Sequence, residues 1–290
     1  STPSNSSAAS DVYKRQIQGF VEKKHTGDLR HIVIRNSAHT GKNLVVLVIN
    51  ATKNFDRLND FAKAIYDEFE EVSGVCINFN SKKTNVILGH KTECICGDEF
   101  VQEKILDKTF KIGANTFFQI NPESAENIFR YVKDYIKGNF EAPTILDAYA
   151  GISSFGICVS DVCKKVVSVE ENKDSCELAR IVAKENNVNN IEIHNMDAGK
   201  FFAKEKRKFD AIILDPPRKG CSKESLDEAY RLSKGVIIYV SCNPATLARD
   251  LKYLCEKGCR VESIQPFDMF CHTCHIENTA IIHLPKEKLI

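Results

Sequence analysis

Five apolar runs in the second half of the chain constrain its fold more than any other feature, because they alternate with segments of helical periodicity. The runs are residues 144–149, 166–169, 191–193, 211–214 and 236–240. The helical segments are residues 172–186, 223–232 and 244–255. Strands that are apolar throughout and alternate with helices are typical of a parallel sheet covered on both faces. We therefore predict an α/β fold with a doubly wound, mostly parallel sheet.

The segments that flank this alternating region complete the predicted domain. Before it, apolar side chains recur on one face of a helix over residues 123–136. After it, the apolar runs 260–264 and 279–284 have no helical pattern between them. Such a pair fits an antiparallel C-terminal edge of the sheet. We expect this domain to cover residues 113–290.

The N-terminal part has a different pattern. Residues 44–49, 75–79 and 86–88 are predicted strands, and apolar side chains recur at helical spacing from Phe55 to Val72. These elements are too few for a large independent core, so residues 17–112 are interpreted as a small, partial α+β lobe. Residues 1–16 are rich in Ser and Ala without apolar periodicity and are interpreted as a disordered flank, native or not.

Composition excludes several classes of protein. Of the 290 residues, 43% are hydrophobic and 27% are charged, which rules out global disorder. The longest wholly apolar run, residues 44–49, is far too short to cross a bilayer. No basic and then apolar signal opens the sequence, so we expect a cytoplasmic protein with reduced cysteines, 12 in all. The net charge of +1 neither indicates nor excludes a nucleic-acid partner.

The first two strand ends of the predicted sheet suit an adenosine-type cofactor. Ligands of such sheets bind outside the carboxyl ends of the strands, and Gly151 lets the backbone approach a ligand closely. Glu170, 19 residues later, is placed to accept both hydroxyls of a ribose. The loop lacks the full set of glycines that cradles a pyrophosphate, which argues against a dinucleotide. Asp197, after the third strand, could meet an adenine amino group or equally cap a helix.

The fourth and fifth strand ends carry groups that suit chemistry. The fourth ends in Asp215, two prolines, Arg218 and Lys219, a combination that a purely structural loop seldom needs. The fifth ends in Ser-Cys242-Asn-Pro, in which Asn243 suits a helix N-cap. Cys242 therefore lies at a strand end and at a helix N-terminus. Both features expose a thiol and lower its pKa, as a nucleophile requires, although a buried cysteine is the usual alternative.

The tail offers two interpretations. Cysteines 255, 259, 271 and 274, with two histidines, could hold zinc, but their spacing departs from the common C-x2-C pairs. Zinc is therefore the minor alternative. Glu277, at the start of the last apolar strand, faces the same end of the sheet and could act as a general base.

These motifs together resemble those of the bacterial S-adenosylmethionine-dependent RNA 5-methyluridine methyltransferases, and most nearly the branch that modifies 23S rRNA. The matching motifs are FFQIN at 117–121, DAY at 147–149, DPPR at 215–218, SCNPATLARD at 241–250 and DMF to HIE at 268–277. The resemblance begins near Leu29 and continues to the C-terminus. Residues 29–35 resemble the 23S rRNA branch more than the tRNA branch.

The resemblance implies a class I methyltransferase fold, S-adenosylmethionine as cofactor and RNA, not DNA or a membrane, as partner. In the family, Cys242 corresponds to the nucleophile and Glu277 to the base. The positions that would hold the cofactor are Gln119, Tyr149, Gly151, Glu170, Asp197 and Asp215. A uridine must leave the base stack to be reached from both faces, so a flipped or looped uridine is the expected substrate. Oligomeric state is left open.

Three departures from the family pattern matter. The N-terminal RNA-binding barrel is absent from this sequence. Cys94 and Cys96 do not reproduce the cysteine pattern of the family's iron–sulfur cluster, so we expect no cluster and no metal. Ser153 stands where the family usually has the second glycine of its cofactor loop.

Several alternatives remain open from the sequence. One is the tRNA member of the same family, and another is a truncated, inactive remnant that binds RNA or cofactor. A methyltransferase acting on an exocyclic amine fits less well, because it needs no cysteine nucleophile. Residues 200–260 carry 14 Lys and Arg against 8 Asp and Glu, which suits contact with phosphates or an ordinary solvated surface.

Overall fold

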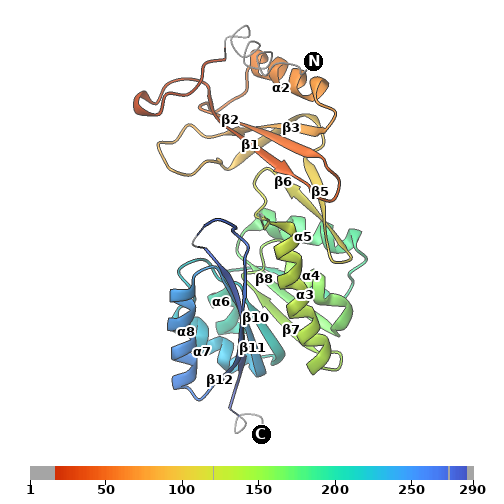
Figure 1. The fold of residues 1–290 in the computed structure, drawn as a ribbon, viewed down its shortest axis with the longest axis vertical. Helices are drawn as coiled ribbons and strands as arrows, with labels where there is room; N and C mark the ends of the chain where they lie inside the picture. Colours follow the sequence, from red (N-terminus) through yellow and green to blue (C-terminus); the bar gives the residue numbers. More distant parts are fainter. Residues whose placement is uncertain (1–16, 120, 274, 286–290) are drawn as a thin grey trace. The chain divides into compact units, whose positions relative to one another are not determined.

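The computed structural model of the protein describes residues 17–119, 121–273 and 275–285 (Figure 1). The chain divides into two compact units. Unit 1 consists of Ser1–Glu103 and Phe110–Phe117, and unit 2 of Lys104–Thr109 and Phe118–Ile290. The predicted flank at residues 1–16 lies outside the described residues.

Unit 1 is built on a four-stranded sheet of order β1-β2-β3-β4. Its elements are η1 (Glu22–Lys24), β1 (Leu29–Asn36), β2 (Asn43–Ile49), α2 (Asp56–Glu68), β3 (Val72–Phe79) and β4 (Lys91–Gly97). The helix α2 connects the parallel strands β2 and β3 and buries Leu58, Phe61 and Ala62 against the sheet. The two central strands confirm the predictions for residues 44–49 and 75–79. The helix predicted from Phe55 to Val72 is shorter, because the backbone is already extended at Phe69 and Val72 begins β3.

The strand predicted at residues 86–88 is wrong. These residues form a loop in which the side chain of Val86 is 61% exposed. The physical reason is the amide of Asn80, which donates to the carbonyls of Val86 at 2.7 Å and Ile87 at 2.9 Å. A side chain thereby takes the backbone acceptors that a sheet would use. The partner of β3 is instead β4.

A two-stranded hairpin, β5 (Phe100–Ile105) and β6 (Lys108–Gly113), contributes residues to both units. In unit 2 the start of β6 is tied to the end of α5 (Lys173–Glu185). The backbone N–H of Thr109 donates to the Asn186 side chain at 2.8 Å, and the Asn186 amide donates back to the Thr109 carbonyl at 2.7 Å.

Unit 2 is a seven-stranded sheet of order β12-β13-β11-β10-β7-β8-β9. The strands are β7 (Thr144–Ala148), β8 (Lys165–Glu170), β9 (Ile191–Asn195), β10 (Phe209–Leu214), β11 (Ser233–Ser241), β12 (Arg260–Phe267) and β13 (Glu277–His283). The first five are parallel, whereas β13 is antiparallel to both of its neighbours, β11 and β12. The predicted parallel sheet with an antiparallel C-terminal edge is confirmed.

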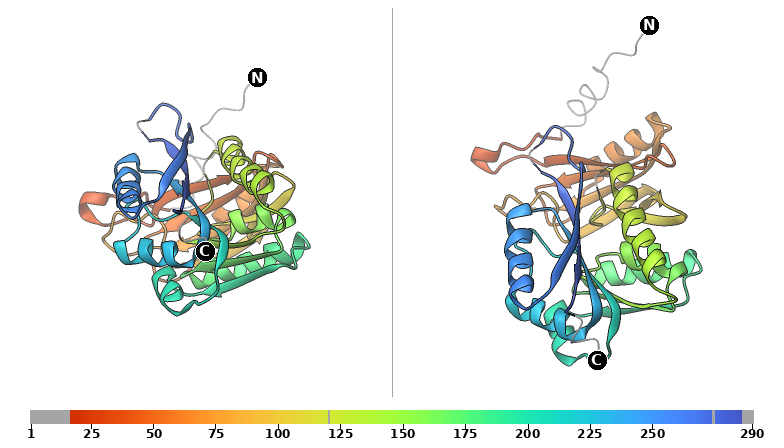
Figure 2. Two further views of the ribbon diagram at one scale, coloured as in Figure 1. Left: turned by 90° about the horizontal axis from the view of Figure 1, so that it is seen from below. Right: turned by 60° about the horizontal axis from the view of Figure 1, so that its bottom comes forward.

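Helices cover both faces of this sheet (Figure 2). The helices besides α5 are α3 (Pro122–Asn139), α4 (Ser154–Val159), η2 (Ser160–Val162), α6 (Ala198–Lys204), α7 (Lys223–Leu232) and α8 (Pro244–Glu256). Helices α6, α7 and α8 share one buried cluster with the strands, in which Phe202, Leu226 and Leu254 pack beside Ile237. Helices α4 and α6 were not predicted, because elements of six and seven residues leave little periodicity to detect.

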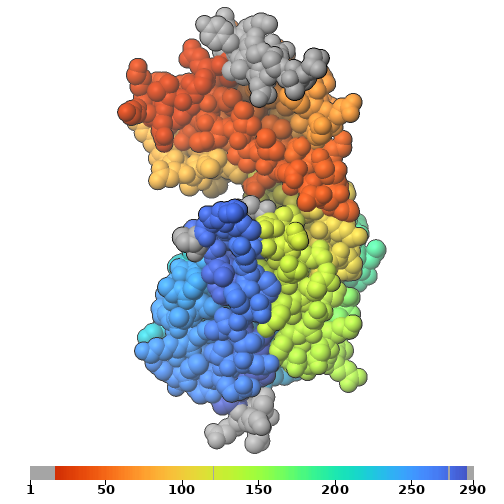
Figure 3. All heavy atoms as spheres, viewed as in Figure 1, coloured from red at the N-terminus to blue at the C-terminus, as the bar shows by residue number. Residues whose placement is uncertain are grey.

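Helix α3 packs along the antiparallel edge, and the two lie side by side on the surface of unit 2 (Figure 3). The hydroxyls of Tyr131 on α3 and Ser263 on β12 are 3.0 Å apart. The Ser124 hydroxyl, in the first turn of α3, donates to the carbonyl of Asp268 at 2.7 Å. The start of α3 is therefore tied to the loop that leads into β13. No helix among the described residues is long and apolar enough to cross a membrane.

The position of β11 between β10 and β13 makes a clear prediction for stability. Ile237 on β11 has no exposed surface, so Ile237→Ala is expected to lower the free energy of unfolding by about 2–5 kcal/mol. The matched control is Ile264→Ala on the edge strand β12, where Ile264 is 49% exposed and the expected loss is about 0.5 kcal/mol. Urea unfolding followed by circular dichroism measures both. Equal losses would contradict the central position of β11.

Candidate active site

The sheet of unit 2 brings most of the predicted site residues to one edge, at which the five parallel strands end. The residues at this edge are Tyr149 and Gly151 after β7, Glu170 at the end of β8, Asp197 after β9, Asp215 after β10 and Cys242 after β11. Glu277 is the first residue of the antiparallel strand β13, so it lies at the same edge.

Cys242 and Glu277 are brought together by strand pairing. Ser241, the last residue of β11, pairs with Asn278 in the antiparallel register of β11 and β13. Continuing this register by one residue places Cys242 opposite Glu277. Cys242 is half-buried, whereas Glu277 is only 5% exposed. Asn243 caps helix α8 by accepting from the backbone N–H of Ala245, and Pro244 is its first residue, as predicted.

Burial determines the protonation of the two carboxyls nearest to Cys242. It raises the pKa of Glu277 from 4.5 to about 7, and the positive charge of Arg218 opposes this shift. The pKa of Asp215 is raised well above its usual range by burial and by the charges of Glu277 and Asp147. Near pH 7 the Glu277 carboxyl therefore binds and releases a proton, whereas Asp215 favours its protonated form well above its usual range.

The pKa of the Cys242 thiol is raised, so the prediction of a lowered pKa is wrong. Burial is the largest cause, and the negative charge of Glu277 adds to it. Arg218 lowers the pKa of the thiol and Asp215 raises it. The expected effect of the helix N-terminus does not prevail, because burial, and after it the charges of Glu277 and Asp215, disfavour the thiolate. The sequence places Arg218 in the DPPR motif at 215–218 but does not show that its charge reaches Cys242.

The loop after β7 exposes its backbone for a ligand. Tyr149, Gly151 and Ser153 all have positive φ angles, of 62°, 55° and 59°. A side chain added at Gly151 would meet no atom within 4 Å, so the space above this residue is open. The backbone N–H groups of Gly151 and Asn172 donate to the two oxygens of Glu170 at 2.9 and 2.8 Å. Each carboxylate oxygen keeps a further acceptor site, which fits the two hydroxyls of a ribose.

Ser153 is accommodated despite a backbone conformation that favours glycine. Its side chain is buried, and its hydroxyl lies 2.6 Å from that of Ser168 on β8. Both hydroxyls adjoin Asp147, whose Oδ2 accepts from the backbone N–H of Gly156 at 3.0 Å. Oδ1 of Asp147 is buried and has no hydrogen-bond partner among the described residues. Burial raises the pKa of Asp147 to about 7.

Three further residues were predicted to hold the cofactor, and their surroundings differ. Asp197 caps α6 by accepting from the backbone N–H of Lys200 at 2.9 Å, which leaves its other oxygen for a ligand. Tyr149 is half-buried and packs against the core cluster under α6 to α8. Gln119 lies three residues before α3, and within the described part of the chain no hydrogen bond joins it to another site residue. The role predicted for Gln119 stays a prediction.

The alternative zinc set is not assembled within the described residues. No group of three or more His, Cys, Asp or Glu side chains among them could hold a metal ion. Cys259 is buried, whereas Cys255 and Cys271 are exposed. Cys274 lies outside the described residues.

Relatives in sequence share most of this chain. Residues 38–284 match the profile of a family described as tRNA (uracil-5-)-methyltransferase. An uncharacterised RNA methyltransferase of Oceanobacillus iheyensis is 35% identical over 274 residues, which cover 93% of this chain and 59% of the relative. One of Bacillus cereus is 36% identical over 274 residues, with the same coverage of 93% and 59%. The chain thus spans about three fifths of the length of these curated relatives.

Solved structures share the fold. The Pyrococcus abyssi tRNA (uracil-54, C5)-methyltransferase, solved in complex with S-adenosyl-L-homocysteine, superposes with a TM-score of 0.79 at 31% identity. The match covers 94% of this chain and 64% of that one. A Methanocaldococcus jannaschii tRNA m1G37 methyltransferase has a TM-score of 0.54 at 14% identity over 91% of this chain and 77% of that one, which shows the fold alone. The α/β fold of class I methyltransferases is thereby confirmed.

The raised pKa of Glu277 predicts a pH-dependent cost in stability. The carboxyl is neutral in the folded protein below about pH 7, whereas in the unfolded chain it ionises above about pH 4.5. As the pH rises between these values, the free energy of unfolding of the wild type falls by up to about 3 kcal/mol. A neutral side chain at this position would not cause this loss. Glu277→Gln is therefore expected to raise the melting temperature, and to raise it more at pH 8 than at pH 5.

The matched control is Glu177→Gln. Glu177 is exposed on α5 and pairs with Lys173 at 3.6 Å, so its effect is expected to stay within about 0.5 kcal/mol at both pH values. A stabilisation by Glu277→Gln that does not grow with pH would show that the Glu277 carboxyl has an ordinary pKa.

Proposed function

This chain belongs to the tRNA (uracil-5-)-methyltransferase family, and from this premise we propose that it transfers a methyl group from S-adenosylmethionine to carbon 5 of a uridine in RNA. One observation carries the proposal. A half-buried thiol, Cys242, and a buried carboxyl with a pKa of about 7, Glu277, come together at the strand ends of a class I methyltransferase sheet. A nucleophile and a base are the two groups that this reaction requires from the protein.

The reaction needs a nucleophile because carbon 5 of uracil is a poor one by itself. The sulfur of Cys242 adds to carbon 6 of the ring, and the electron pair of the 5,6 double bond moves toward the carbonyl at carbon 4 as an enolate. Carbon 5 of this enolate would then form a bond to the methyl group, while the bond from the methyl group to the donor sulfur breaks and its electron pair stays on that sulfur. Glu277 takes the proton from carbon 5, and the electron pair of that bond restores the double bond as the thiolate leaves carbon 6.

The electrostatics of the free site suit this order of events. Because the pKa of Glu277 is about 7, only a fraction of its carboxyl groups is ionised near pH 7, which lessens the repulsion of the attacking thiolate; the ionised fraction is the form that accepts the carbon 5 proton. The positive charge of Arg218 favours the ionised forms of both groups. After methyl transfer, the raised pKa makes Glu277 a stronger base than an exposed carboxylate would be.

S-adenosylmethionine supplies the methyl group from its sulfonium, and the loop after β7 together with the next strand ends would hold it. Glu170 would accept hydrogen bonds from the ribose hydroxyls beside the open backbone of Gly151, and Asp197 would offer the oxygen that does not cap α6 to the adenine. Asp215 lies between this side and Cys242. Tyr149 and Gln119 complete the proposed set by their resemblance to the family.

We propose a uridine of 23S rRNA as the target, since residues 29–35 resemble that branch. A tRNA uridine is the second candidate. It is favoured by the likeness to the Pyrococcus abyssi enzyme, which is named for uridine 54 of tRNA. We further propose that the protein acts in the cytoplasm.

The chemistry is tested by methyl transfer from radiolabelled S-adenosylmethionine to unmodified 23S rRNA and, in parallel, to unmodified tRNA. Cys242→Ala is expected to abolish the label, because no other group in the proposed mechanism adds to carbon 6. Glu277→Gln is expected to slow turnover roughly 10²- to 10⁴-fold and to trap a protein–RNA adduct, because the carbon 5 proton stays in place. Cys255→Ala, an exposed cysteine on α8, is the control and is expected to retain full activity.

The outcomes separate the candidates. Label as 5-methyluridine in 23S rRNA alone supports the proposed target, and label in tRNA alone replaces it with the second candidate. Cofactor binding and salt-sensitive RNA binding without any label would contradict catalysis and indicate a remnant.

Cofactor binding makes a separate prediction. Glu170→Gln is expected to weaken the affinity for S-adenosylhomocysteine about 10- to 100-fold, because hydrogen bonds to a charged group contribute about 1.5–3 kcal/mol. The control is Glu171→Gln, whose side chain is exposed next to it in the chain. Isothermal titration calorimetry measures both variants. Equal affinities for wild type and Glu170→Gln would remove Glu170 from the site.

A further inference from the structure

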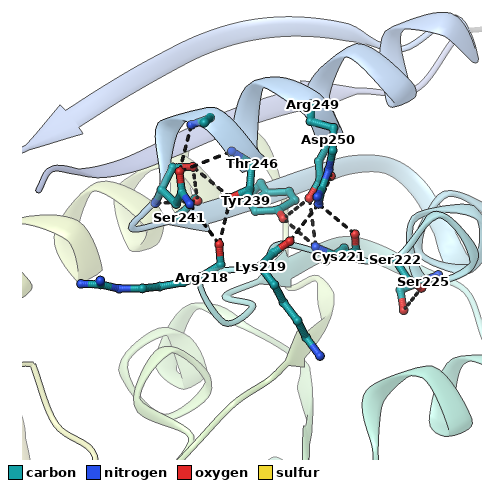
Figure 4. Close-up of polar contacts among 12 residues, drawn as sticks. Arg218, Lys219, Cys221, Ser222, Ser225, Tyr239, Ser241, Thr246, Arg249 and Asp250 are labelled. Atoms are coloured by element: carbon teal, nitrogen blue, oxygen red, sulfur yellow. Dashed lines mark hydrogen bonds and ion pairs between the residues drawn. The ribbon is translucent and has the colours of Figure 1, made fainter.

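The loop between β10 and α7, residues 215–222, is held to helix α8 and strand β11 by a dense set of hydrogen bonds (Figure 4). Its backbone turns back on itself, because the N–H of Gly220 donates to the carbonyl of Pro217 at 2.8 Å. Two residues of this loop, Asp215 and Arg218, place their charges near Cys242. What fixes this loop therefore fixes the surroundings of the nucleophile.

Three carbonyls of the loop accept hydrogen bonds from side chains of α8 and its cap. Asn243 and Thr246 both donate to the carbonyl of Arg218 at 3.2 Å. The guanidinium of Arg249 donates to the carbonyl of Lys219 at 2.9 Å and to that of Cys221 at 3.2 Å. The side chains of Arg218 and Lys219 extend away from this network (Figure 4).

Asp250 is the centre of the network. It is 2% exposed, and its Oδ2 accepts from the backbone N–H of Cys221 at 2.9 Å and from the hydroxyl of Tyr239 at 2.6 Å. Its Oδ1 accepts from Arg249 at 2.8 Å. A buried carboxylate that is bonded on both oxygens defines one geometry, and any loss of a partner is costly.

The contact is close enough to require glycine in the loop. Gly220 has a φ of +73°, and a Cβ at this position would lie 2.5 Å from Oδ2 of Asp250 and 2.6 Å from the Arg249 guanidinium. The loop and the helix thus fit each other from both sides. Helix α8 begins two residues after Cys242, so it is continuous with the strand end that carries the thiol.

We propose that Asp250 and Arg249 are positioning residues that fasten the loop of residues 215–222 to helix α8 and thereby hold Arg218 beside Cys242. This inference deepens the proposed function and rests on it for its catalytic consequence. The placement of Arg218 beside Cys242 can be tested independently of the proposed function, because the reactivity of the thiol can be measured without RNA.

The test measures alkylation of Cys242 by iodoacetamide as a function of pH, in the full chain, by peptide mass spectrometry. The charged groups that face Cys242 are Glu277 from β13 and Asp215 and Arg218 from the loop. Asp215 directly follows β10 and its N–H lies 3.4 Å from the carbonyl of Ala148 in β7, so it stays in place when the later part of the loop is released.

Asp250→Asn is expected to move the midpoint of Cys242 alkylation to higher pH, because the charge of Arg218 no longer lowers the pKa of the thiol. Arg218→Gln should shift the midpoint in the same direction and sets the size of the full effect. General loosening of the fold would instead expose the thiol and move the midpoint to lower pH. With RNA, Asp250→Asn should lower kcat up to roughly 100-fold while the KM for S-adenosylmethionine stays within about twofold.

Two matched controls accompany this variant. Asp227→Asn removes a half-buried acid that also bonds a tyrosine and a cation, Tyr253 and Lys257, but lies outside the loop. Gly220→Ala disturbs the same contact from the loop side, and its control Gly258→Ala has a φ of +87° with no atom closer than 3.6 Å. Asp227→Asn and Gly258→Ala should keep the wild-type midpoint, and Gly220→Ala should raise it.

An unchanged or lowered midpoint in Asp250→Asn overturns the proposal, as does an equal upward shift in Asp227→Asn. If the midpoint rises as expected but the wild type transfers no methyl group, the positioning role stands and the proposed function fails. The exposed cysteines Cys255 and Cys271 serve as internal references, and their alkylation should follow the same pH curve in every variant.

Discussion

The antiparallel register of β13 against β11 is the constraint on which the site depends. In a strand, a slip of one residue turns every side chain to the other face, so it would remove Glu277 from Cys242. Burial on both faces of β13 means that an apolar pattern alone does not specify this register. The sizes of the paired side chains specify it instead. Tyr239, which is large and fully buried, pairs with the small Ala280. A slip would put Thr279 or Ile281 against the ring, without room for either.

The sequence predicts the parts of this fold that depend on local pattern. The bounds of α7 are as predicted, and the five parallel strands lie where the apolar runs are, because burial on both faces leaves an unbroken run. The positions of Cys242 and Glu277 follow from strand ends. The raised pKa of Cys242 did not follow, because it depends first on burial of the thiol and then on two acids, Glu277 and Asp215, that are distant in the sequence. The failed strand at residues 86–88 has a local origin, because the amide of Asn80, only a few residues earlier, takes its carbonyls.

Three acidic groups at this end of the sheet lower the stability of the fold instead of raising it. Asp147, Asp215 and Glu277 all have raised pKa values because burial disfavours their charged forms. A well-packed apolar residue would cost less at each position. Raised pKa values that gather in one place are typical of sites that move protons. Although Arg218 is exposed, its positive charge lowers the pKa values of both Cys242 and Glu277 and so favours their ionised forms.

Tyr239 takes part in both contacts that assemble this site, the register of β11 with β13 and the hydrogen bonds that hold the loop of residues 215–222. Its ring packs in the core cluster opposite Ala280 and so specifies the register that brings Glu277 to Cys242. Its hydroxyl donates to Asp250, which holds the loop that carries Arg218. One residue of the central strand β11 thus contributes to the placement of Cys242, Glu277 and Arg218. Because the two contacts share one side chain, a substitution of Tyr239 would disturb both of them together.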